Sequence, residues 1–377
     1  MSSSRPYPSR LVHVDVARQR FGSLVDRLAP ALWRGDPAGD AAVRALRRDG
    51  WGTFDAALRG EVASEPVRAL LDGVSDGLEV EERPRLARAG RVFFRTGPIG
   101  GMVLGARSLV AGYCSPAGNK PLVQTGALQR DGDRRLAETG RFVAEVHREG
   151  GLEPGAKGWQ LCLRVRLMHA QVRLLLMERG DWDEAAWGHP LNQHDLVATS
   201  LLFSVVWLDG VRRFGFAIDA EEQEDHLHLW RRASRVLGVE QDLLPRNVPH
   251  GRAMFEVIRT TQEPPDDDAR ALVRALLTPK GARVAPEGMP EGLCRALTEP
   301  EMADSLELPR NRWRHAPWVM RAFVGPMEGV RARRPSLERR LVKRGQAYWE
   351  RVIALGMGGR QAVFAPARRL DGPPTAR

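Results

Sequence analysis

The sequence has little cysteine and no long hydrophobic run. Its three cysteines, Cys114, Cys162 and Cys294, lie far apart, which excludes a zinc knuckle or a readable disulfide framework and favours a reduced, cytoplasmic setting. The most apolar segment, residues 197–208, is shorter than the ~20 residues of a membrane span. We therefore expect a buried helix there. The N-terminus also lacks the apolar stretch that a signal peptide needs.

Lysine is scarce as well, because nearly all the cations are arginine. The net charge is +10, and residues 310–377 alone hold 16 basic and 4 acidic residues, a balance of +12. Such an excess would suit an anionic surface. The basic helix expected over residues 336–355 is a candidate for peripheral membrane contact. No RRM, KH, zinc-finger or helix-turn-helix pattern accompanies the charge, so we do not expect nucleic acid as a partner.

The usual cofactor and nucleophile motifs are missing. The sequence has no Gly-x-Gly-x-x-Gly after a strand, no P-loop, no Gly-x-Ser-x-Gly elbow after a strand and no His-Glu-x-x-His. These absences argue against a Rossmann cofactor site, an α/β-hydrolase and a zinc protease of that type. The acidic run at residues 266–268 lacks the glycine and distal glutamate of a calcium loop. Alternating strand patterns are almost absent too.

What remains is helical periodicity. We expect an all-α fold with one large domain over residues 35–355, a loosely packed lead at 1–34 and a tail at 356–377. The clearest predicted helices cover residues 40–48, 159–179, 195–214, 219–237 and 336–355.

Two shorter segments have less regular patterns. Residues 115–121 contain two prolines and predict a rigid loop, in which Lys120 would point into a site or into solvent. Gly97, Gly101 and Gly105 recur at every fourth position and predict a smooth helix face. We favour a close helix–helix contact there over a flat ligand.

The segment at residues 159–179 carries the strongest candidate site. It is apolar nearly all round and should be deeply buried, yet it contains Arg164, Arg166, His169 and Arg173. Buried cations need anions, which the chain or a ligand would supply. Carboxylate candidates within the chain are Glu138, Glu145, Asp195 and Asp209.

A lone buried histidine is more often structural than a metal ligand. His169 is nevertheless the best single candidate for an iron ligand, with His194 second. His226 and His228 are two residues apart and point in different directions, so they cannot form a helix-face metal pair.

An ordered series of motifs resembles a known family. It comprises residues 118–122 (GNKPL), 135–143 (RLAETGRFV), 164–173 (RVRLMHAQVR), 192–196 (NQHDL), 208–213 (LDGVRR) and 226–231 (HLHLWR). Together they resemble the MpaB/latex-clearing protein (rubber oxygenase) catalytic-domain family over roughly residues 35–260.

The resemblance implies an all-α, globin-like core that binds haem b through one axial histidine and uses dioxygen. In latex-clearing proteins the reaction is oxidative cleavage of a polyisoprene double bond. A functional arginine of that family maps to Arg164. A threonine four residues later is Met168 here, and the axial histidine falls near Leu201, where this chain has none. Either His169 or His194 would replace it, or haem is not bound.

We therefore expect a haem-dependent oxygenase that acts on a small apolar substrate, isoprenoid or lipid, with dioxygen. His169 would hold the iron, and Arg166, Arg173 and Lys120 would bind the cofactor. Arg164 and Glu138 are the catalytic candidates, with Glu138 as the base that removes an allylic proton. The alternative is a non-catalytic helical protein that binds a lipid or another apolar ligand without haem.

Overall fold

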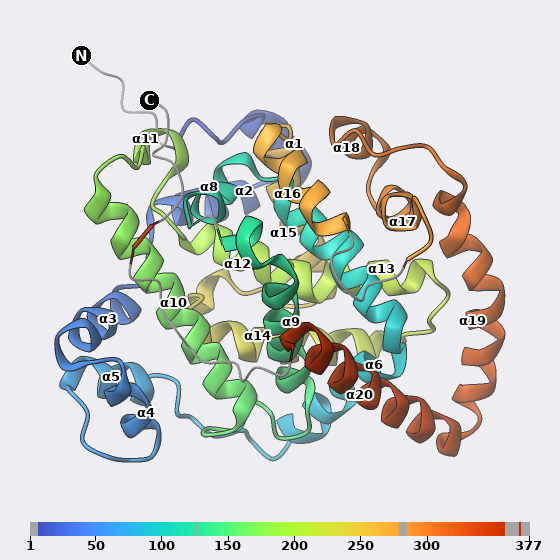
Figure 1. The fold of residues 1–377 in the computed structure, drawn as a ribbon, viewed down its shortest axis with the longest axis horizontal. Coiled ribbons are helices and arrows are strands. Elements are labelled where there is room, and N and C mark those ends of the chain that lie inside the picture. Colours follow the sequence, from blue (N-terminus) through green and yellow to red (C-terminus); the bar gives the residue numbers. More distant parts are fainter. Residues whose placement is uncertain (1–6, 126, 279–284, 359–368, 371–377) are drawn as a thin grey trace.

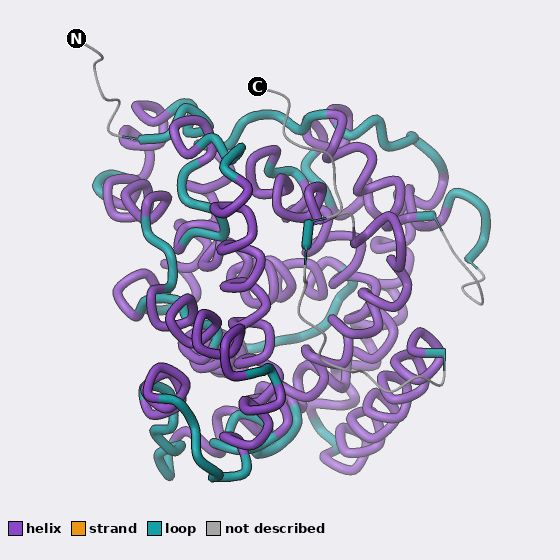
Figure 2. Tube along the Cα trace, turned by 60° about the vertical axis from the view of Figure 1, so that its left-hand side comes forward, coloured by secondary structure: helices purple, strands orange, loops and turns teal. Residues whose placement is uncertain are grey.

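The computed structural model describes residues 7–125, 127–278, 285–358 and 369–370. Helices make up this part of the chain, and its one β contact is an isolated bridge between Leu11 and Gln262. Figure 2 shows helices on every side of the molecule and no strand among these residues. The predicted all-α fold is confirmed. Most of the predicted tail at 356–377 lies outside the described residues.

The first half of the chain forms helices around the long, kinked α6. These elements are α1 (Val14–Phe21), α2 (Leu24–Leu28), η1 (Ala29–Trp33), α3 (Pro37–Asp49), α4 (Gly52–Leu58), α5 (Glu65–Asp72), α6 (Glu82–Val103), η2 (Leu104–Leu109), α7 (Val110–Tyr113), α8 (Pro116–Thr125), α9 (Ala127–His147) and α10 (Lys157–Arg179).

The second half of the chain completes the bundle. Its elements are α11 (Glu184–Trp187), α12 (Gln193–Leu201), η3 (Leu202–Val206), α13 (Trp207–Arg213), α14 (Ala220–Val236), η4 (Gln241–Leu243), α15 (Val248–Thr260), α16 (Asp267–Leu277), α17 (Met289–Leu297), α18 (Pro300–Ser305), η5 (Arg312–His315), α19 (Ala316–Ala332) and α20 (Pro335–Met357). In Figure 1, α3 to α5 lie at the lower left and α17 to α19 at the right, on either side of the central helices.

Side-chain caps fix where several helices begin. Asp36 accepts a hydrogen bond from the Gly39 amide at the start of α3, and Asp219 forms a capping box with Glu222 at the start of α14. These caps satisfy backbone donors that a helix leaves unpaired at its N-terminus. At α12 the cap is Asn192, which accepts from the Asp195 amide, while the Asp195 side chain binds Arg10.

Two of the predicted irregular segments contain helices. Residues 14–33 of the lead form α1, α2 and η1, whose Ala17, Leu28 and Leu32 are completely buried or nearly so. The predicted loop at 115–121 is largely α8, because Pro116 occupies its first turn, where the missing N–H costs nothing.

The three glycines predicted to share one helix face lie in α6 and η2 and differ in their surroundings. Gly97 has φ of 50° and marks a kink before Pro98, a backbone conformation that glycine tolerates. Gly101 approaches Tyr348 and Trp349 of α20, which agrees with the favoured helix–helix contact. Gly105 has no neighbour that a side chain would meet.

The predicted apolar helix runs continuously from Gln193 to Arg213. By length and composition it is the one helix of the described chain that could span a membrane, but 78% of its most apolar window is buried inside the protein. It is therefore a core helix of this fold. Its middle, η3, is π-helical, as is η2 of the facing segment. Such irregular turns often occur at functional sites.

Candidate functional site

A cavity of about 320 Å³ lies beside the two π-helical segments. One wall comes from α7 and α8, a second from α12, η3 and α13, and a third from α15, with α17 and α18 closing the end. The apolar lining includes Ala111, Cys114, Ala198, Leu202, Val205, Val206, Phe255, Ile258 and Met302. A space of this size with mainly apolar walls suits a small apolar ligand.

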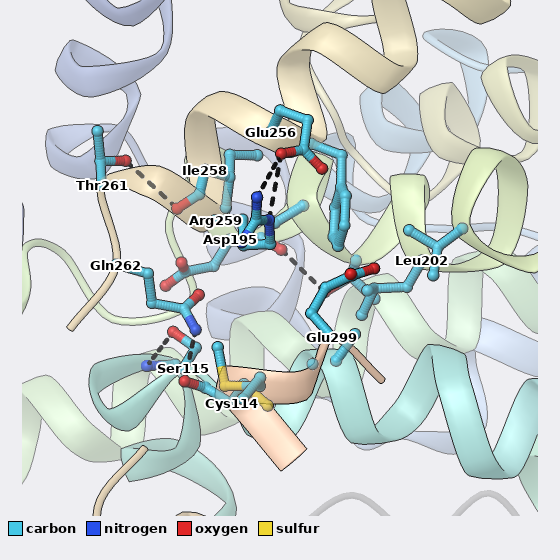
Figure 3. Close-up of a pocket in the computed structure, with 18 of the residues that line it drawn as sticks. Cys114, Ser115, Asp195, Leu202, Glu256, Ile258, Arg259, Thr261, Gln262 and Glu299 are labelled. Atoms are coloured by element: carbon cyan, nitrogen blue, oxygen red, sulfur yellow. Dashed lines mark hydrogen bonds and ion pairs between the residues drawn. The ribbon is translucent and has the colours of Figure 1, made fainter. Parts of the chain in front are cut away.

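Most charged groups of the cavity wall are already paired. Arg10 forms two hydrogen bonds to Asp195, Arg252 binds Asp209 at 2.6 Å, and Arg259 binds Glu256 at 2.6 Å. Figure 3 shows the Glu256–Arg259 pair at the top of the cavity, with Ser115 and Cys114 at the bottom. Paired charges around an apolar interior leave shape and apolar contact as the main determinants of binding.

The cavity wall also contains Arg107, which binds backbone carbonyls, and His194, which lies beside a carboxylate. Burial lowers the pKa of Arg107 to about 10, and this guanidinium donates to the backbone carbonyls of Val206 and Leu297. His194 is the imidazole on the wall, with its Nδ1 3.4 Å from Asp195 Oδ1. A carboxylate beside one ring nitrogen is the usual support of a ligating histidine.

The three arginines predicted on α10 are held by the chain's own carboxylates. Arg166 binds both oxygens of Asp36, at 2.7 and 2.8 Å, and Arg173 lies 3.3 Å from Asp40. Both acids come from the start of α3, which packs against α10. Arg164 binds Asp55 at 2.5 Å. Internal carboxylates therefore neutralise all three cations, one of the two options that the sequence left open.

His169 lies on the same helix and has a different environment. Its Nδ1 is enclosed and has no hydrogen-bond partner, while the residue keeps part of its surface exposed. Burial, reinforced by the Arg173 guanidinium, lowers the pKa of His169 to about 4. The imidazole is thus neutral near pH 7, the form that binds a metal. His169 lines neither the cavity described above nor the open pocket beside Asp36 and Arg166.

The two remaining predicted residues have partners away from His169. Lys120 on α8 binds Asp268 at 2.8 Å and Asp266 at 3.5 Å, which joins α8 to α16. Glu138 accepts a hydrogen bond from Arg134 one turn earlier on α9. Neither contact joins these residues to Arg164 or His169.

Sequence reasoning missed a buried pair of imidazoles, His147 and His226. Their rings stack with centroids 5.3 Å apart, and the two residues are 1% and 0% exposed. His228, two residues on, turns outward to Glu82 at 2.9 Å, so the predicted divergence is confirmed. The described chain holds no group of three histidine, cysteine or acidic side chains that could bind a bare metal ion.

The fold and its mainly apolar cavity define an all-α domain suited to a small apolar ligand. Residues 95–332 match the family described as ER-bound oxygenase mpaB/B'/Rubber oxygenase, catalytic domain. The match covers well over half of the chain, so the chain belongs to this oxygenase family. The predicted family is confirmed, although the match begins later and extends further than the expected residues 35–260.

Two relatives agree with this membership. A rubber oxygenase from Streptomyces sp. (strain K30) is 25% identical over 122 residues, which are 32% of this chain and 29% of that protein. The match thus spans less than a third of the relative's length. A solved structure of latex clearing protein LCP in the closed state covers 85% of this chain and 91% of its own, with a TM-score of 0.66 and 16% identity. At that identity the likeness shows the fold.

Proposed function

We propose that the protein is a haem-dependent oxygenase that uses dioxygen to oxidise a small apolar substrate of the isoprenoid or lipid class. Membership in the oxygenase family supports the reaction class. The observation that carries the cofactor proposal is the imidazole of His169, which is neutral near pH 7 and has an unpartnered Nδ1.

Among the described histidines, His147, His169 and His226 have an enclosed ring nitrogen without a hydrogen bond. His147 and His226 are packed inside a column of aromatic rings, with neighbouring centroids 4.1 to 5.3 Å apart. A macrocycle cannot approach either imidazole without separating that column. Because His169 alone among these three keeps exposed surface, it is the one that a haem iron could reach.

The two predicted propionate partners on α10 differ in how fully they are paired. Arg166 donates to both oxygens of Asp36, and removing one partner of a buried ion pair is costly. Arg173 lies 3.3 Å from Asp40, but its Nε and Nη2 are buried without a hydrogen bond. Arg173 would therefore be the better partner for a propionate, together with Arg135 on α9, whose charge also lowers the pKa of His169.

When bound, haem supplies the redox chemistry and the activation of dioxygen. This chain would contribute a neutral imidazole ligand at His169. Arg164 and Glu138 stay proposals as catalytic residues. Each is ion-paired, to Asp55 and Arg134 respectively, so each pair would have to open before either residue could contact the substrate.

A specific observation favours the alternative function. The apolar cavity beside Leu202 is not lined by His169, and the α10 arginines are neutralised without any ligand. A protein that only binds an apolar molecule would need no more than this cavity.

An absorption spectrum separates the two functions. Purified full-length protein, titrated with haemin and then reduced, should develop a Soret band at one haem per chain, and His169→Ala should abolish it. His315→Ala, at an exposed surface histidine, is the matched control and should bind normally. A band that survives in His169→Ala but disappears in His194→Ala would contradict the assignment to His169. Failure of the wild-type chain to bind haem would sink the oxygenase proposal and favour the alternative.

A further inference from the structure

Helix α19 exposes large aromatic side chains, whereas its inner side combines Val324 with a buried ion pair. Its Glu328 is 1% exposed and Arg331 9% exposed, and they bind one another at 3.1 Å on the inner side. Trp318, by contrast, is 78% exposed and Phe323 is 75% exposed. A surface helix normally buries its apolar stripe and exposes its charges, so this helix requires an explanation.

The exposed side of α19 is a continuous apolar stripe. We define the α19 stripe as Trp318, Val319, Ala322, Phe323, Pro326, Gly329 and Val330, all of which are exposed. Positions 319, 323, 326 and 330 follow the helical repeat, and 318 and 322 lie beside them. Single exposed apolar side chains are normal, whereas a contiguous group marks an interaction surface.

Arginines border the α19 stripe at both ends. Arg312 and Arg314 precede the helix, Arg333 and Arg334 follow it, and all four are exposed. In Figure 1, α19 lies at the right-hand edge of the molecule, leading into α20. An apolar helix face with aromatic side chains and flanking cations matches the boundary between the headgroups and acyl chains of an anionic bilayer.

A second copy of this chain fits the surface less well. Two copies meeting through the α19 stripe about a two-fold axis would bring clusters of the same arginines near one another. Like charges so placed oppose association. The arrangement of charges therefore favours an anionic partner with an apolar interior.

We propose that the α19 stripe is a membrane-binding surface that inserts Trp318 and Phe323 into the interface of a bilayer containing anionic phospholipids. The flanking arginines contact the headgroups. This differs from the contact expected through residues 336–355, because α20 turns Gly345 and Trp349 inward against α6 and α9 and presents mainly charged residues to solvent. The proposal does not depend on haem or on oxygenase activity.

Vesicle flotation of the full-length protein tests the proposal. The wild-type chain should float with vesicles of phosphatidylcholine and phosphatidylglycerol, and binding should weaken with salt and with pure phosphatidylcholine. The double variant Trp318→Ser/Phe323→Ser should bind at least about ten-fold more weakly, because each buried aromatic contributes roughly ten-fold or more in affinity. Val62→Ser/Val80→Ser, at exposed valines outside the stripe, is the matched control and should bind as the wild type does.

A second readout locates the contact. Tryptophan fluorescence of the wild type should be quenched by bromine-labelled lipid in the vesicles, and Trp318→Phe should lose most of this quenching while still floating. Because Trp318 and Phe323 are mostly exposed, the thermal midpoint of the double variant should match that of the wild type, which excludes misfolding.

Three outcomes would overturn the proposal. Unchanged flotation of the double variant, with loss of binding in Arg339→Gln/Arg340→Gln/Arg344→Gln, would assign the contact to α20. Self-association that the double variant abolishes, without binding to vesicles, would show that a second copy covers the stripe. Absence of both vesicle binding and self-association would leave the stripe without the bilayer partner proposed here.

Discussion

The imidazole rings of His147 and His226 stack at the centre of the bundle, 5.3 Å apart between centroids and 25° from parallel. Phe93 covers the other face of His147 at 4.1 Å, and Trp207 covers His226 at 4.7 Å. His147 bonds to the Val143 carbonyl and His226 to the Phe203 carbonyl. These contacts join α6, α9, α13 and α14 through one column of rings.

This column should make the protein sensitive to mild acid. Burial lowers the pKa of His226 to about 4 and that of His147 well below its ordinary 6.5. The unfolded chain therefore takes up protons before the folded one does. Each histidine's contribution to the free energy of unfolding is therefore complete above the pKa of about 6.5 that the imidazole has in the unfolded chain. Below that pH the contribution falls by about 1.4 kcal/mol per pH unit for each histidine, until the pH reaches the lower pKa of the folded state.

Urea unfolding at about pH 7.5 and about pH 5.5 measures this dependence. On going from the higher to the lower pH, the free energy of unfolding of His226→Gln should fall by about 1 kcal/mol less than that of the wild type. The reason is that this variant lacks one of the titrating imidazoles. His315→Gln, at the surface, should match the wild type. An equal loss in His226→Gln and the wild type would show that His226 does not titrate in this range.

The Arg166–Asp36 ion pair should be structural. The two side chains are 10% and 5% exposed, and Asp36 also caps α3 through the Gly39 amide. Arg166→Met should lower the free energy of unfolding by about 3–5 kcal/mol, because it leaves a buried carboxylate unpaired. Arg59→Met, which breaks an exposed pair with Glu61, should leave the free energy of unfolding nearly unchanged, because solvent screens the exposed charges. Similar values for both variants in urea unfolding would contradict a structural role for Arg166.

Sequence periodicity predicted the all-α fold and the bounds of several long helices, but not those of α6, α9 or α19. The helix expected over 159–179 is α10, Lys157–Arg179, and the one over 336–355 is α20, Pro335–Met357. Such segments carry their own signals in apolar spacing, caps and terminal glycines. The prediction of a loop at 115–121 was wrong. A proline normally indicates a break in a helix, and only the structure shows that Pro116 lies in the first turn of α8, where proline is tolerated.

The candidate site was less predictable, because partners of buried charges come from distant parts of the chain. Arg166 was expected to bind a cofactor, but its guanidinium donates a hydrogen bond to Asp36, which lies 130 residues earlier in the chain. Nothing near Asp36 in the sequence distinguishes it from an ordinary cap. His147 also ends an unremarkable amphipathic helix, so only the fold shows that it meets His226.

The crossing of α20 over α6 should tolerate no added atom at Gly345. A Cβ there would come 1.7 Å from the carbonyl oxygen of Phe94, so the two helices would have to separate. Gly345→Ala should destabilise the protein by about 1–3 kcal/mol, as overpacking does. Gly329→Ala in α19 is the control, because no neighbour lies within 4 Å of its added Cβ, and it should stabilise by about 0.5–1 kcal/mol. Equal thermal midpoints for the two variants would refute the close contact.

The three thiols should be unreactive in the native protein. Cys114, Cys162 and Cys294 are free and buried, and burial raises the pKa of Cys114 and of Cys294 to about 12. A thiol reagent needs the thiolate and access to it. At about pH 8, labelling with a chromogenic disulfide should therefore be slow in buffer and should reach all three cysteines quickly in urea. Rapid native labelling of Cys114, identified by mass spectrometry, would contradict this prediction and show that the cavity wall at α7 and α8 opens readily.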